Sequence, residues 1–193
     1  MRDTFSCRST RHVPRGLSSV ETLVVIVIAT SLAAIAFPSF SQLIAQYRLN
    51  AGSNALMSAF IMARQSAIEK NQVIGICAGN TEAGCHSDWS RGEWIVFTDR
   101  DRNGKSDEVD DVIQSGSATP DHRIRILPNR PMKQPVLFQP IGHAEQASGA
   151  FAAGTLRLCI EASTVTQGVD LILSKSGHLR SQSLDDGSAC LPP

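Results

Sequence analysis

The sequence lacks the local patterns by which many enzymes are recognised. No serine stands in a nucleophile elbow, and the glycine that a phosphate-binding loop needs ahead of Gly104-Lys105-Ser106 is replaced by Asp99. Four histidines have no neighbouring acid at metal-ligand spacing, namely His86, His122, His143 and His178. We therefore expect no enzyme, no catalytic residue, no metal and no cofactor.

Net charge is also absent, since 18 Lys and Arg balance 18 Asp and Glu. The charges are unevenly spread, because the first sixteen residues hold four of the basic residues and one of the acidic ones. The remainder therefore carries 14 basic and 17 acidic residues, a net charge of −3. A mildly acidic body argues against bulk electrostatic binding of nucleic acid, which needs a clustered basic face. Internal repeats are absent too, so 193 residues suggest one domain with accessory segments.

A long apolar run is present near the N-terminus. Residues 17–37 would reach about 30 Å as a helix, the thickness of the hydrocarbon layer of a bilayer. The arginines that precede this run would hold the N-terminus on the cytoplasmic side. A secretory signal peptide is the competing interpretation, because Ala34-Ile35-Ala36 has the small-x-small form of a cleavage site. Glu21 near the start of the run, and a helical period that continues beyond it, favour a retained membrane segment.

The helical pattern continues beyond Pro38. Five apolar positions recur at seven- and four-residue spacings and predict one buried stripe: Leu49, Leu56, Phe60, Ala63 and Ala67. We expect Pro38 to kink this helix rather than end it, and Asn71 to mark its close.

Short β-type runs separated by Gly, Pro, Asp and Asn follow the helix. They predict seven strands, at residues 73–77, 94–98, 124–127, 136–139, 155–160, 169–173 and 179–183.

Five cysteines are present, of which one precedes the apolar run and four follow it. An even number beyond a membrane segment is typical of a compartment that permits disulfides. We expect Cys77 to pair with Cys85 across a short turn, and Cys159 to pair with Cys190 and so hold the C-terminal tail on a central strand. Four unrelated buried thiols, or a zinc site that combines Cys77 and Cys85 with His86, are the alternatives.

The start of the apolar run resembles the class III signal of type IV pilins. Gly16 is followed by an apolar helix with Glu21 near its start and Pro38 further along, as in that signal. The later sequence is similar to the GspH/FimT family of minor pilins and pseudopilins. The similar stretches are residues 63–77, 138–142, 155–159 and 176–180, together with Trp89, Gly92, Trp94, Phe97, Asp99, Asn103, Gly104 and Asp107.

The resemblance implies a type IV pilin-like member of the α+β class, in which a long N-terminal helix with a membrane-spanning first half packs on antiparallel β-sheets. It implies a cleaved leader at residues 1–16, a transmembrane half of the helix at 17–37, an amphipathic half at 38–71 and a periplasmic β-rich domain at 72–193. The chain would be anchored in a bacterial inner membrane. Its partners would be the other pilins or pseudopilins of a type II secretion pseudopilus or of a type IV pilus.

Roles for individual residues follow from the same resemblance. A prepilin peptidase would cut after Gly16 and methylate the new amine of Leu17. A carboxylate in hydrocarbon costs about 2.5 to 3.5 kcal/mol, so Glu21 needs a partner, for which the amine of Leu17 is the candidate. The pair can form within one chain, or between neighbouring subunits, where it would set the axial register of a filament.

Two local motifs leave other functions open. Gly177-His178-Leu179-Arg180, shortly after Lys175, is similar to a Gly-Arg-x-Arg stretch that contacts DNA in FimT-type members. A DNA-binding subunit for uptake, with Lys175 and Arg180 as contacts, is therefore the alternative function. Residues 99–110 fit the spacing of an EF-hand calcium loop, except that Asp replaces the final Glu. A strand ahead of this loop and two interleaved arginines favour a hairpin turn over a calcium site.

Overall fold

The structure is a computed structural model that describes residues 16, 18–107, 110–119, 124–161, 166–184 and 190–193, without the side chains of residues 35–39, 41 and 161. It divides into two compact units, residues 1–40 and 41–193. One helix, α1 (Ser19–Lys70), belongs to both and includes Pro38. It is followed by Asn71 in the left-handed conformation, with φ of 52°, which is a common way to end a helix. The predicted close of the helix at Asn71 is confirmed.

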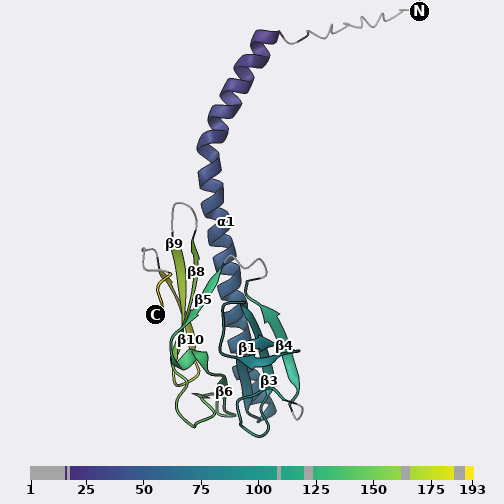
Figure 1. The fold of residues 1–193 in the computed structure, drawn as a ribbon, viewed down its shortest axis with the longest axis vertical. Coiled ribbons are helices and arrows are strands. Elements are labelled where there is room, and N and C mark those ends of the chain that lie inside the picture. Colours follow the sequence, from purple (N-terminus) through teal and green to yellow (C-terminus); the bar gives the residue numbers. More distant parts are fainter. Residues whose placement is uncertain (1–15, 17, 108–109, 120–123, 162–165, 185–189) are drawn as a thin grey trace, which may run out of the picture. The chain divides into compact units, whose positions relative to one another are not determined.

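Two antiparallel sheets make up most of the second unit (Figure 1). The first has the order β4-β3-β1-β6-β7, with β2 paired to β1. Its strands are β1 (Ile74–Asn80), β2 (Gly84–His86), β3 (Glu93–Thr98), β4 (Val112–Ser117), β6 (Val136–Phe138) and β7 (Ala144–Glu145). The second has the order β10-β9-β8-β5, formed by β5 (Arg125–Pro128), β8 (Gly154–Glu161), β9 (Thr166–Leu173) and β10 (Leu179–Leu184).

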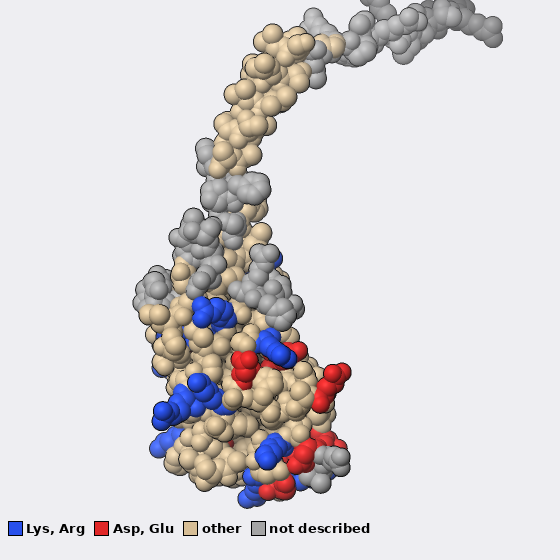
Figure 2. Space-filling view, viewed as in Figure 1, with Lys and Arg blue, Asp and Glu red and all other residues tan. Residues whose placement is uncertain are grey.

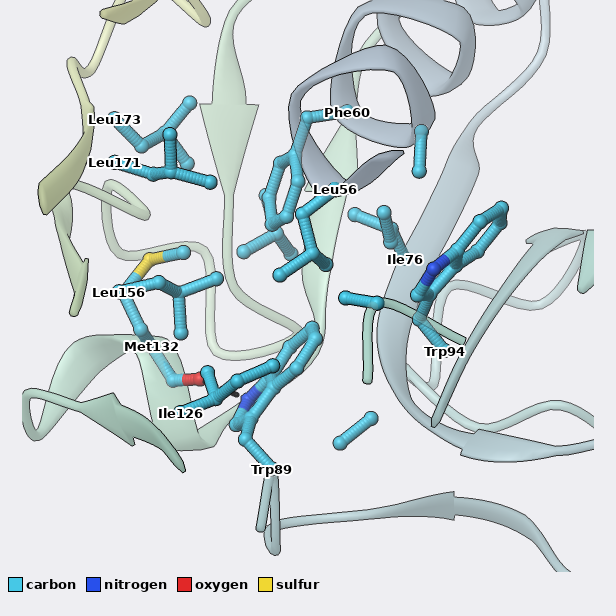
Figure 3. Packing of buried hydrophobic residues seen from close by; sticks show 14 of the residues in the cluster. Leu56, Phe60, Ile76, Trp89, Trp94, Ile126, Met132, Leu156, Leu171 and Leu173 are labelled. Atoms are coloured by element: carbon cyan, nitrogen blue, oxygen red, sulfur yellow. Dashed lines mark hydrogen bonds between the residues drawn. The ribbon is translucent and has the colours of Figure 1, made fainter. Parts of the chain in front are cut away.

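The C-terminal half of α1 lies between these sheets and supplies the centre of the core (Figures 1 and 3). All five residues of the predicted stripe are buried, and Leu56 and Phe60 are at most 1% exposed. The ring of Phe60 meets that of Phe138 edge to face, with centroids 6.4 Å apart. Leu56 and Phe60 extend between Ile76 of the first sheet and Leu171 of the second in Figure 3. The helix therefore joins two sheets that share few direct strand contacts.

Trp89 connects the two halves of this core. Its side chain is 2% exposed and its indole Nε1–H donates to the carbonyl oxygen of Met132 at 2.8 Å, the dashed line of Figure 3. Met132 belongs to a short 3-10 helix, η1 (Pro131–Lys133), which packs near β5 and β8. A buried indole needs such an acceptor, so this bond fixes the loop ahead of β3 against the second sheet.

The α+β fold class and all seven predicted strands are confirmed, each to within about three residues at its ends. Three short or polar strands, β2, β4 and β7, were not predicted.

In the first unit the large apolar side chains are exposed, whereas the second unit buries most of its own. Within residues 18–34 every described side chain is exposed, including large apolar ones such as Val20 at 71% and Leu23 at 62%. The face of this segment that Figure 2 shows carries no charged side chain. Of the helices in the part of the chain that the structure describes, none reaches the length and apolarity required of a membrane span.

Candidate functional site

The predicted processing signal lies at the beginning of α1. Gly16 is exposed, and a Cβ atom built on it would have no neighbour within 4 Å. Leu17 lies outside the described residues. Ser18 precedes the first turn and its Oγ accepts a hydrogen bond from the backbone N–H of Glu21 at 3.2 Å. The serine therefore caps the helix, and Glu21 occupies the position of the acid in a capping box.

Sequence reasoning missed this cap, although the spacing of Ser18 and Glu21 is the signal for it. A carboxylate in the first turn is also favoured by the positive end of the helix dipole. Glu21 thus has a local role in beginning the helix, in addition to the expected role as partner of an amine. Its pairing with Leu17 stays a prediction.

Two disulfides join the cysteines in the expected pairs. Cys77 of β1 is bonded to Cys85 of β2, with an S–S distance of 2.05 Å, and Cys159 of β8 to Cys190 in the C-terminal tail, with 2.06 Å. The zinc hypothesis needs Cys77 and Cys85 as free thiolates, but these two cysteines form a disulfide with each other, so that hypothesis is wrong. His86 instead accepts a hydrogen bond at Nδ1 from the backbone N–H of Asp88.

A buried ion pair supports the attachment of the tail. Arg157 of β8 contacts Asp170 of β9 through Nε and Oδ1 at 2.7 Å, and their side chains are 13% and 11% exposed. The same guanidinium donates through Nη1 to the carbonyl oxygen of Leu191, at 2.9 Å. Arg157 and the Cys159–Cys190 bond therefore hold the tail to one strand at two points.

The acidic loop between β3 and β4 is a hairpin turn, as predicted. Its base is closed by Thr98 and Asp111, because the N–H of Thr98 donates to the carbonyl of Asp111 at 2.9 Å and the N–H of Asp111 donates to Thr98 Oγ1 at 2.8 Å. Inside the loop Asp99 is 1% exposed. Burial raises the pKa of its carboxyl and the nearby Asp110 raises it too, whereas the backbone N–H of Gly104 acts in the opposite direction.

The two residues of the proposed DNA contact lie around the turn between β9 and β10. Lys175 is exposed in that turn, with Nζ 5.7 Å from the centre of the Phe151 ring, and Arg180 is exposed on β10, where it donates to the side-chain oxygen of Gln182. The turn needs a glycine at position 177, because a Cβ atom there would lie 2.1 Å from the carbonyl oxygen of Gly142. On the face shown in Figure 2, basic side chains gather on the side of β8 to β10 and acidic ones on the side of β3 and β4.

Comparison with known proteins agrees with this arrangement. A family model described as type II transport protein GspH matches residues 52–177, more than half of the chain. The crystal structure of the type IV minor pilin FimU from Pseudomonas aeruginosa PAO1 is similar, with a TM-score of 0.51 at 12% identity, covering 71% of this chain and 90% of that one. A second crystal form of FimU gives 0.48 at 13% identity, with 69% and 92% covered. No curated protein matches in sequence.

A long N-terminal helix that packs on antiparallel sheets gives the chain a type IV pilin-like fold. The chain belongs to the GspH family and is a minor pilin or pseudopilin.

Proposed function

We propose that the mature chain begins at Leu17, is anchored by the first half of α1 in a bacterial inner membrane, and joins a filament as a structural subunit without catalytic activity. The filament is a type II secretion pseudopilus or a type IV pilus. The observation that carries this proposal is the contrast along α1. Its second half buries an apolar stripe in its own domain, whereas its first half exposes its apolar side chains.

Exposed apolar surface of this extent needs a partner, because a water-soluble protein rarely leaves a large contiguous apolar patch uncovered. Eight large apolar residues in the described part of this half are more than 45% exposed: Val20, Leu23, Val24, Val25, Ile26, Val27, Ile28 and Leu32. Lipid before assembly, and the equivalent helices of other subunits after it, are the environments that would cover them. The proposed span of residues 17–37 also includes Leu17 and the side chains of residues 35–37, which lie outside the described part.

Glu21 would then mediate assembly. In lipid its carboxylate has few partners, and a neighbouring subunit that offers the amine of Leu17 would satisfy it. The capping interaction with Ser18 leaves the carboxylate available, because the cap uses the serine hydroxyl and the backbone N–H of Glu21.

Replacement of Glu21 tests this role. In the native host, Glu21→Ala should still insert into the membrane, but should disappear from the sheared filament fraction. Glu69→Ala is the matched control, since it removes an exposed acid from the other end of the same helix. We expect this control to assemble as the native chain does. Normal incorporation of Glu21→Ala would contradict the assembly role and leave Glu21 with only its place as an acid in the first turn of the helix.

The two filament systems can be separated by deletion of the gene. Loss of secreted enzymes with intact surface pili would assign the chain to a pseudopilus, and the opposite result would assign it to a pilus. A deletion strain that still secretes its enzymes and still makes surface pili would contradict a required structural role in either filament.

A further inference from the structure

A cavity of about 550 Å³ lies beside β2, and four segments that are distant from one another in the sequence form its wall. They are residues 85–87 at the end of β2, 103–105 in the loop between β3 and β4, 133–135 at the end of η1, and 146–148 after β7. All of these residues belong to the described part of the chain. Cavities of about 300 to 1,000 Å³ are the size in which proteins hold ligands.

The segments contact one another in succession around the cavity. Cys85 is tied to β1 by its disulfide. A Cβ atom on Gly104 would lie 3.1 Å from that of Ala147, so the loop between β3 and β4 packs directly on the loop after β7. Gln146 then donates through Nε2 to the carbonyl oxygen of Pro131 in η1, at 3.2 Å. Three of the four segments are joined in this way.

Two further contacts close the ring at β2. A Cβ atom on Gly84 would lie 3.3 Å from the carbonyl oxygen of Ser106, which brings β2 against the loop between β3 and β4. On the other side, the indole of Trp89 after β2 donates to the carbonyl oxygen of Met132 in η1. The walls are therefore ordered before any ligand binds, and binding does not have to order them.

The charged side chains of the lining are all basic. They are Lys105 and Lys133, and His86 is the other titratable side chain. None of the residues that line the cavity is Asp or Glu. Residues 17–193 are net acidic, so this excess of basic groups is local. A concave site lined by charges of one sign concentrates the electric field and attracts ions of the opposite sign, here anions.

Neither lysine is neutralised within the part of the chain that the structure describes. The ion pairs seen there include neither Lys105 nor Lys133. Asp101 and Asp107 belong to the same loop as Lys105, but they accept hydrogen bonds from Asn103 and do not line the cavity. Ammonium groups are donors only, so a ligand that complements these two must bring acceptor atoms.

His86 adds an uncharged donor to the two cations. Its Nδ1 accepts from the backbone N–H of Asp88 at 3.3 Å, which places the hydrogen of the neutral ring on Nε2. Ser87 and Gln134 add a hydroxyl and an amide, which can donate or accept. Cations beside uncharged polar groups match a carboxylate that is carried on a peptide backbone.

We propose that this cavity binds an acidic peptide segment of another filament subunit, whose carboxylates contact Lys105, Lys133 and His86. Pro135 and Ala147 also give the lining apolar surface, which suits a peptide better than the phosphate backbone of a nucleic acid. The identity of the partner as a filament subunit rests on the proposed function, whereas the binding of acidic peptide by the cavity does not.

A free peptide should bind weakly, because ion pairs that involve exposed lysines contribute little each. We expect a dissociation constant of about 10⁻⁴ to 10⁻³ M at low salt. In a filament the partner segment is tethered close to the cavity, and the effective concentration that tethering supplies, about millimolar, is enough to fill such a site.

The test is a fluorescence-polarisation titration of the whole chain in detergent with a labelled Asp-Ala repeat peptide, at about 0.05 M salt. The same peptide with Asn in place of Asp is the uncharged control. The native chain should bind the Asp peptide about tenfold more tightly than the Asn peptide, because each Asp contributes to the two or more ion pairs that form.

Variants locate the binding in the cavity. Lys105→Gln and Lys133→Gln should each weaken binding about threefold to fivefold, and the double variant should bind the Asp peptide no better than the Asn peptide. Ala147→Trp fills the cavity without a change of charge and should also abolish binding. Lys70→Gln is the matched control, since it removes an exposed lysine from the last turn of α1, and it should bind as the native chain does.

Absence of binding up to about 5 mM Asp peptide, or native affinity in the double lysine variant, would overturn the proposal. Inorganic phosphate or duplex DNA that displaces the labelled peptide as readily as unlabelled Asp peptide does would also overturn it, in favour of a general anion site or a nucleic-acid site. The titration needs no filament, so its failure would leave the assembly role of Glu21 intact, and a failure of that role would not change the titration.

Discussion

Arg157 and Asp170 lie directly opposite each other on β8 and β9 and share two hydrogen bonds, from Nε to Oδ1 at 2.7 Å and from Nη2 to Oδ2 at 2.8 Å. Loss of one member of a largely buried pair leaves the other charge without compensation. Asp170→Ala should therefore lower the free energy of unfolding by about 3 kcal/mol, as measured by urea denaturation of the mature chain.

Two further variants separate the pair from a general loss of charge. Arg180→Ala removes an exposed arginine from the adjacent strand and should change stability by less than about 0.5 kcal/mol. The double variant Arg157→Met with Asp170→Leu should recover part of the loss, because it removes both charges together. An Asp170→Ala variant as stable as the native chain would refute the structural importance of this pair.

The two disulfides should differ in their contribution to stability. The Cys77–Cys85 bond closes a loop with a sequence separation of 8, and the Cys159–Cys190 bond one of 31. Loop-closure entropy then predicts losses of about 2 to 3 kcal/mol for the first pair and about 3 to 4 kcal/mol for the second when each is changed to alanine. Denaturation of the two double variants measures the difference. A larger loss for the first pair would show that packing of its sulfur atoms near Ile95 and Phe97 outweighs loop length.

The elements that the sequence predicted are those whose apolar residues recur with a clear period. The stripe from Leu49 to Ala67 and the buried strand β1 are examples. β4 was missed because it is a polar edge strand with Gly116 in it and mostly exposed positions, so its pairing with β3 is decided by the hairpin and not by its own composition. β2 and β7 are too short to show alternation.

The sites were predictable where the chemistry is local in sequence. The cysteine pairs could be predicted from a compartment that permits disulfides and from a plausible short turn. The proximity of Asp99, Asp101 and Asp110 could be seen only in the folded chain. In this hairpin the backbone N–H groups of Asn103 and Gly104 donate to the two carboxylate oxygens of Asp99 and hold that side chain inside the loop. Spacing alone carries no information on which donors end up buried.

DNA binding by the chain from Leu17 onward should be weak. Lys175 and Arg180 are the two cations near the turn that the sequence singles out, and residues 17–193 are net acidic. We expect little binding of duplex DNA at about 0.15 M salt, where charges are screened beyond about 8 Å. Binding at lower salt should fall with a log-log slope of about −2 at most.

Variants make this prediction specific. His178→Arg adds a charge to the same turn and should strengthen binding at low salt, whereas Arg180→Ala should abolish it. Arg91→Ala, an exposed arginine ahead of β3, serves as the control and should have little effect. A fluorescence titration that finds clear, Arg180-dependent binding at about 0.15 M salt would favour the uptake function over the structural one.

The most direct test of assembly through α1 is the intact mass of the chain recovered from the sheared filament fraction of its own host. The mass should correspond to a chain that begins at Leu17, carries one methyl group on its amine and contains both disulfides. A chain that begins at Phe37, found as a free soluble domain and absent from the filament fraction, would contradict assembly through α1 and support the secretory signal peptide instead.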